Sequence, residues 1–159
     1  MIRIPDLRWV VRLVWVVVAP AWFVWIALED RTLAPVMLLA ALISSAFAIT
    51  GLARWRSGTR VERRRWLLES TGVGLAAGAL VAPAAILLIL IKISIHAHGT
   101  PDFSPTDIGA VIRRFPVWML AGTLCGEALG LALVVAARRE VPRERMDGDR
   151  GVVNPPHDA

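Results

Sequence analysis

Four stretches of this chain, each about twenty residues long, are almost free of charged side chains. They run over residues 9–28, 33–53, 71–95 and 115–137. A helix needs about 20 residues to cross a hydrocarbon core of about 30 Å. We therefore expect an all-α fold, a four-span transmembrane bundle of two helical hairpins. Residues 1–137 form a single membrane domain in this interpretation, and residues 138–159 form a charged tail that we expect to be disordered.

Composition excludes the main soluble alternatives. Hydrophobic residues make up 56% of the chain and charged residues 19%, against about 45–50% and 25% in soluble domains. A soluble enzyme, a disordered chain and a DNA-binding module do not fit these values. A cleavable signal peptide competes for the first stretch, because Ala19-Pro20-Ala21 resembles a cleavage site. The apolar run continues to Ile26, so we expect an uncleaved helix.

The basic residues are distributed unequally about the four stretches, and this predicts the orientation. Fourteen arginines flank one side, in the N-terminal arm, between the second and third stretches and in the tail; three arginines flank the other side. Lys and Arg concentrate on the cytoplasmic side of membrane proteins, so both termini are expected in the cytoplasm. The net charge of +5 thus requires no nucleic-acid partner. Arg outnumbers Lys seventeen to one, which favours a GC-rich bacterial genome and hence a bacterial inner (plasma) membrane.

The connection over residues 54–70 combines six arginines with Trp55 and Trp66. We expect an anchored juxtamembrane segment, with tryptophans at headgroup depth and arginines on the phosphates of anionic lipids. A docking site for a partner or for an acidic lipid is the sharper alternative.

The connection before the fourth span predicts a short interfacial helix and contains the only metal-ligand pattern. Ser104-Pro105-Thr106-Asp107 has the features of a helix start, and the helix would present Ile108, Val111, Ile112 and Phe115 on one face. In an extended His-x-His, both imidazoles point to the same side. Nearby carboxylates could complete a zinc-like site, whose candidate ligands are His96, His98, Asp102 and Asp107. The alternative is that both histidines are interfacial hydrogen-bonding residues.

Few polar side chains fall inside the spans, and Glu127 is the deepest. It lies roughly 15 Å from either end of its span, where an exposed acid costs several kcal/mol. We therefore expect it to face the bundle interior, paired or carrying a proton. Its candidate partners are Thr123, Ser44 and Ser45, while Lys92 lies nearer the membrane edge, where its side chain is expected to extend outward. A functional site and a hydrogen-bonded peg between helices both remain open for Glu127.

Small residues repeat every four positions in the last two spans, and they indicate helix packing. The ridges consist of Gly122, Gly126 and Gly130 in one span and Gly74, Gly78 and Ala82 in the other. Such spacing lets helix backbones approach closely. The ridges therefore predict a tight antiparallel hairpin, with a homodimer contact as the alternative.

The chain carries no P-loop, nucleophile elbow or zinc-protease motif, and its lone Cys125 excludes a disulfide framework. We expect no cofactor, apart from the alternative metal at His96 and His98, and we lean against an enzyme. Three functions remain open. One is an accessory or interaction subunit of an inner-membrane assembly. Another is a homo-oligomeric transporter or channel that uses Glu127, and the third is a metal- or ligand-binding outer loop.

Overall fold

A computed structural model describes residues 2–28, 32–95 and 103–148 of the chain. It contains α1 (Arg8–Ala27), α2 (Leu33–Arg56), α3 (Arg63–Ile95), α4 (Pro105–Arg113) and α5 (Phe115–Gly148), with two-residue strands β1 (Ile2–Arg3) and β2 (Arg60–Val61). Four helical segments are long and apolar enough to cross a membrane, namely α1, α2, α3 and the Phe115–Ala137 part of α5. The structure is therefore all-helical apart from the two short strands, and its four long apolar helices, which overlap the four expected stretches, are compatible with a helical membrane protein.

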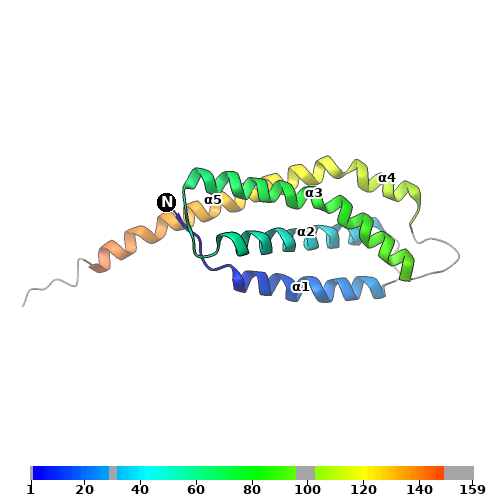
Figure 1. Ribbon diagram of the computed structural model, residues 1–159, viewed down its shortest axis with the longest axis horizontal. Coiled ribbons are helices and arrows are strands. Elements are labelled where there is room, and N and C mark those ends of the chain that lie inside the picture. Colours follow the sequence, from blue (N-terminus) through cyan, green and yellow to red (C-terminus); the bar gives the residue numbers. More distant parts are fainter. Residues whose placement is uncertain (1, 29–31, 96–102, 149–159) are drawn as a thin grey trace, which may run out of the picture.

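The long helices are arranged as a layer rather than as a closed ring. Helix α3 packs extensively against both α2 and α5, while α1 packs mainly against α2. In Figure 1, α1 lies on the side of α2 that faces away from α5. Most side chains of α1 and of the Phe115–Ala137 part of α5 are consequently exposed. Both expected hairpins are present, and the α1 and α5 surfaces are the ones left for lipid or for other proteins.

Helix α3 begins eight residues before the expected start of the third span, at Arg63 instead of residue 71. Only residues 57–62 separate it from α2, so the expectation of a long juxtamembrane connection over residues 54–70 is wrong. Trp66 does not lie at the surface: it is 1% exposed, and its Nε1 donates a hydrogen bond to the Gly130 carbonyl oxygen at 3.2 Å. We attribute the early start of α3 to this contact, because the first turns of the helix pack on α5 through Trp66.

The N-terminal arm is attached to the connection between α2 and α3. Strands β1 and β2 pair antiparallel, with Ile2 opposite Val61, and the Ile4 amide donates to the Thr59 carbonyl at 3.0 Å. Ile4, Val61, Trp66 and Val134 form a buried apolar cluster beneath this pairing. We call this end of the molecule the basic end, because the arginines of residues 54–65 gather there. The cluster fixes the ends of α3 and α5 to the arm.

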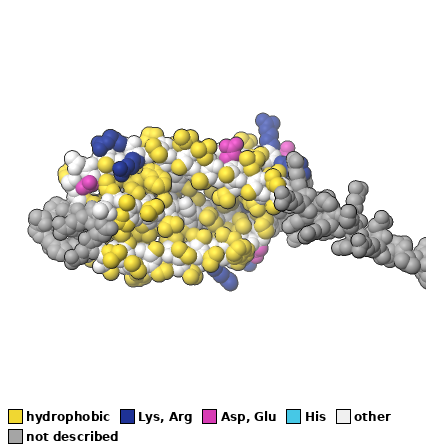
Figure 2. Space-filling view, turned by 180° about the vertical axis from the view of Figure 1, so that it is seen from behind, with side chains coloured by type: hydrophobic (Ala, Val, Ile, Leu, Met, Phe, Trp, Pro, Cys, Tyr) yellow, Lys and Arg dark blue, Asp and Glu magenta, His cyan; other side chains and the backbone are white. Residues whose placement is uncertain are grey.

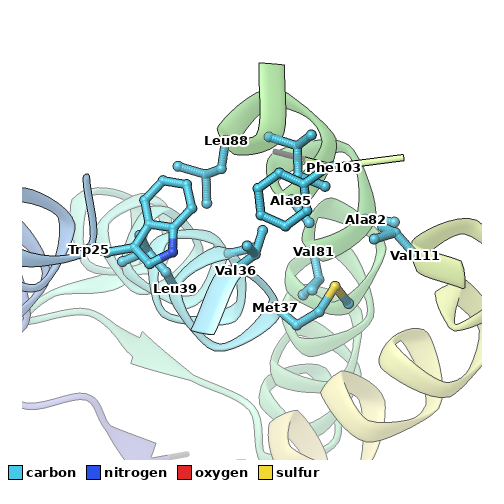
Figure 3. Packing of buried hydrophobic residues seen from close by; sticks show 12 residues of the cluster. Trp25, Val36, Met37, Leu39, Val81, Ala82, Ala85, Leu88, Phe103 and Val111 are labelled. Carbon is cyan, nitrogen blue, oxygen red and sulfur yellow. The ribbon is translucent and has the colours of Figure 1, made fainter. Parts of the chain in front are cut away.

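The main core lies at the opposite end, where α1, α2, α3 and α4 converge. Figure 3 shows the Trp25 ring, Val36 and Leu88 facing one another, with Val111 of α4 beside Ala82 of α3. Helix α3 contains Pro83, and its ribbon bends along the half that leads to Ile95 (Figure 1). A proline inside a helix removes one backbone donor and causes such bends.

Helix α4 begins where the sequence predicts. Ser104 is its N-cap, and Ser104 and Asp107 form a reciprocal capping box. Hydrogen bonds from the Ser104 hydroxyl and then the Ser104 amide hold the pKa of the Asp107 carboxyl below its usual range. Val111 is buried, whereas Ile112 is 56% and Phe115 36% exposed. Helix α4 therefore covers the main core at Val111, and the expectation that the apolar face of this helix lies on the outer leaflet or caps the bundle stays a prediction.

Helix α5 continues past the expected end of the fourth span, through residues 138–148. Arg and Glu, which are good helix formers, dominate this extension. Residues 149–159 of the expected tail lie outside the described residues.

Candidate functional site

The glycine ridges of α3 and α5 bring the backbones of these two helices into direct contact. A Cβ atom added to Gly74 would lie 2.2 Å from the Gly122 carbonyl oxygen, and one added to Gly122 would lie 2.3 Å from the Gly74 carbonyl oxygen. Both distances are far below van der Waals contact, so the two backbones touch where the side chains are missing. The structure thus brings the two ridges together within one chain.

The remaining ridge residues extend this contact in both directions, toward the main core at Gly78 and toward the basic end at Gly126 and Gly130. Gly78 faces the Trp118 carbonyl, and Gly126 and Gly130 face Ser70. Ala82 lies beyond the contact, buried in the main core. Because two helices in backbone contact cannot shift without steric clash, this interface holds the side chains of α5 in a defined direction.

Glu127 does not face the interior, and the expectation that it does is wrong. Its side chain is exposed on α5, next in sequence to the buried Gly126. Successive residues of a helix are 100° apart, so the residue that follows the contact with α3 points away from that contact. In the described part of the chain, neither a hydrogen bond nor an ion pair joins Glu127 to another residue.

The expected partners of Glu127 are engaged or located elsewhere. Thr123 donates its hydroxyl hydrogen to the Met119 carbonyl oxygen at 2.8 Å. Ser44 is 2% exposed, and its Oγ contacts no hydrogen-bonding atom of the described residues. Ser45 is exposed and lines a groove between α2, α3 and α5. Glu127 is therefore a mid-span carboxylate on an outer surface of the chain.

Lys92 is buried, contrary to the expectation that it extends toward the membrane surface. The residue is 1% exposed. Its Nζ donates a hydrogen bond to the Leu28 carbonyl oxygen at 2.8 Å and lies 4.8 Å from the centroid of the Trp25 ring. Leu28 is the C-cap of α1, where unpaired carbonyls and the negative end of the helix dipole attract a cation. The bend of α3 directs Lys92 toward this helix end.

Replacing Lys92 with Met should lower the free energy of unfolding by about 1–3 kcal/mol, because the buried Lys92 side chain no longer donates a charged hydrogen bond to the Leu28 carbonyl at the end of α1. The measurement is denaturant unfolding in detergent followed by tryptophan fluorescence. Ser94→Ala is the control, since Ser94 is exposed on the same helix and bonds only within it, to the Leu90 carbonyl. Equal stability of the Lys92→Met and Ser94→Ala proteins would show that Lys92 contributes nothing at this helix end.

Sequence reasoning missed an ion-pair cluster at the basic end. Glu69 of α3 contacts Arg56 of α2, and both side chains are largely buried, at 12% and 14% exposure. Arg65 reaches the same carboxylate at 2.9 Å. The spacing of Arg65 and Glu69, four residues apart on one helix, was a usable signal. No sequence signal predicted the contact between Glu69 and Arg56, because that contact depends on the packing of α2 against α3.

Only one of the four candidate metal ligands is among the described residues. His96, His98 and Asp102 lie outside the described residues, and Asp107 is engaged in the α4 capping box. Among residues 2–28, 32–95 and 103–148, no group of three or more His, Cys, Asp or Glu side chains is placed to hold a metal ion.

The outer surface of the chain is apolar along most of its length. Figure 2 shows hydrophobic side chains over the body, with basic side chains at its two ends.

Comparisons with protein-family models, with curated proteins and with solved structures found no match to this chain.

Proposed function

We propose that this protein is a non-enzymatic interaction subunit of an assembly in a bacterial inner membrane, with both termini in the cytoplasm. The observation that carries the proposal is the exposed carboxylate of Glu127 at mid-span. A face of α5 centred on Glu127 contacts a transmembrane helix of another protein. The arginines of the basic end contact the anionic headgroups of the inner leaflet, which supports this orientation.

The energetics of the carboxylate favour a protein contact over lipid. A charged acid at the centre of a transmembrane helix costs about 2.5–3.5 kcal/mol on insertion scales, and such residues generally face protein or a water-filled cavity. Within this chain the exposed side chains near Glu127 on α5 include Leu124 and Leu131, which give it no hydrogen-bond donor. A second protein therefore supplies the donor.

The chemistry of the partner follows from the same residue. A complementary helix carries a basic or amide side chain near its own midpoint, flanked by small or apolar residues that pack on the leucines of α5. A second copy of this chain brings no such group. Its spans contain only Arg12 and Lys92 as basic residues, both near span ends, and Lys92 is buried at Leu28. We infer a partner of different sequence.

The test is the mass and composition of the complex extracted from native membranes in a mild detergent. The wild-type protein should purify with a second polypeptide, and Glu127→Leu should lose it by at least about tenfold, which corresponds to 1.4 kcal/mol. Glu127→Gln should retain part of the association, since an amide can still hydrogen-bond. Glu62→Gln is the matched control, because Glu62 is an exposed acid outside the spans.

Two results would contradict the proposal. Undiminished association of the Glu127→Leu protein would remove the α5 face from the contact. An assembly made only of copies of this chain would favour the transporter alternative, in which Glu127 is a proton- or cation-linked site. In that case Glu127→Gln should abolish pH-dependent transport while leaving the fold intact.

A further inference from the structure

An apolar groove runs along the chain between α2, α3 and α5, on a different side of α5 from Glu127. Its cavity volume is about 380 Å³. Its floor includes Gly74 and Gly126, and its walls include Ala77, Ala121 and Cys125. Cys125 and Glu127 are 200° apart around the helix, so an occupant of the groove does not cover the carboxylate.

The groove is long enough for a hydrocarbon chain of one leaflet. Its lining extends along α5 from Trp118 to Leu133, about 22 Å at 1.5 Å per residue. Half of a hydrocarbon core of about 30 Å is shorter than this length, so an acyl chain that enters from one leaflet can lie along the apolar lining.

Arginines lie close in sequence to the residues that line the groove at its basic end. The groove-lining residues at this end are Leu7, Leu52, Trp66 and Leu133. Each of these four lining residues has an arginine within five positions in the sequence. The arginines, in the same order, are Arg8, Arg54, Arg65 and Arg138. Arg8, Arg54 and Arg65 are exposed. Between residues 54 and 69 the chain has six arginines against two acids. The other end of the groove, near Ala41 and Val81, is apolar.

From this combination we infer that the groove binds one acyl chain of an anionic phospholipid. The chain lies on the glycine-lined floor, and the phosphate contacts the arginines at the basic end. Ala77 and Ala121 leave the space open, because larger side chains there would fill it. The site is independent of the proposed function, since it uses a different side of α5.

The test uses phosphatidylglycerol with a photoreactive diazirine in one acyl chain, reconstituted with the full-length protein in phosphatidylcholine vesicles. Labelled residues are located by peptide mass spectrometry. Labelling should concentrate on groove residues of α2 and α5. Ala121→Leu should reduce it severalfold, whereas Ala128→Leu, on the same helix, exposed and outside the groove lining, should not. Ser45→Leu blocks the groove from α2 and provides a second variant should Ala121→Leu fail to fold.

The headgroup requirement is tested separately. Phosphatidylcholine carrying the same photoreactive chain should label the groove about tenfold less, because each basic residue near an anionic surface contributes about 1 kcal/mol. Arg8→Gln with Arg54→Gln should reduce labelling by phosphatidylglycerol to a similar extent. Arg113→Gln with Arg114→Gln removes two exposed arginines that lie outside the basic end. This pair of substitutions should leave labelling by phosphatidylglycerol unchanged.

Three outcomes would overturn the inference. Labelling spread evenly over all exposed faces and insensitive to Ala121→Leu would show only bulk lipid. Equal labelling by the two headgroups would remove the role of the arginines. Efficient Cys125–Cys125 disulfide formation between two chains on mild oxidation would show that a second copy covers the groove. None of these results bears on Glu127, so failure here is distinguishable from failure of the proposed function.

Discussion

Gly74→Ala is expected to lower the free energy of unfolding by about 3 kcal/mol or more. A Cβ at this position would lie 2.2 Å from the Gly122 carbonyl oxygen and 2.8 Å from the Gly126 Cα, so α3 and α5 must separate. Overpacking of a fitted contact costs about 1–3 kcal/mol where side chains can adjust, and backbone atoms adjust less readily. The measurement is thermal unfolding in detergent, and Gly126→Leu should give a larger loss.

Gly72→Ala is the matched control, on the same helix and with the same chemical change. Nothing lies within 4 Å of a Cβ at Gly72. A helical glycine exposed in this way gains about 0.5–1 kcal/mol on replacement by alanine. The two substitutions should therefore change stability in opposite directions. A loss of equal size at both positions would mean that the glycines contribute backbone flexibility rather than close contact.

Trp66→Ala is expected to destabilise the protein by about 3–5 kcal/mol, the usual cost of truncating a buried aromatic side chain. Trp66 fills the apolar cluster beneath the N-terminal arm and donates a hydrogen bond to Gly130, so its loss uncouples α3, α5 and β1 together. Trp66→Phe should recover most of the packing without the hydrogen bond. Denaturant unfolding and proteolysis of the N-terminal arm provide the measurement.

Trp55→Ala is the control for this substitution, eleven residues earlier in the same basic region. Trp55 is 61% exposed, and its ring faces the Arg56 guanidinium at 4.3 Å. Removing it should cost less than about 1 kcal/mol. If both tryptophans proved equally important, the basic end would be stabilised by contacts with lipid headgroups rather than by the cluster around Trp66.

Local features of the chain were predicted well because they depend on local physics. The four spans follow from runs of apolar residues that must satisfy their own backbone hydrogen bonds in a bilayer. The start of α4 follows from the order Ser104-Pro105-Thr106-Asp107, which contains a cap, a proline and an acid in the first turn. Each of these signals lies within one helix length, so no knowledge of neighbouring helices was needed.

The environments of Lys92 and Glu127 could not be predicted in the same way. Distance along the helix located Lys92 near the membrane edge, but the bend of α3 and the free carbonyl at Leu28 decided that it is buried. For Glu127, the sequence was used to estimate how deep the residue lies in its span, but not which side of the helix it occupies. Glu127 follows Gly126 of the glycine ridge, so its side chain is rotated by 100° from the ridge around the helix axis. An argument from depth alone does not use that rotation.

The sequence by itself determined which segments are long and apolar enough to cross a membrane, where the short helix begins and which surfaces of the last two long helices are narrow enough for backbone contact. Only the tertiary structure decided which residues those surfaces meet, how α3 turns toward α1, and that Glu127 is left outside. The physical reason is the apolar environment. In a soluble protein a polar face marks the outside of a helix, but membrane helices are apolar on all sides, so packing alone decides which face is buried.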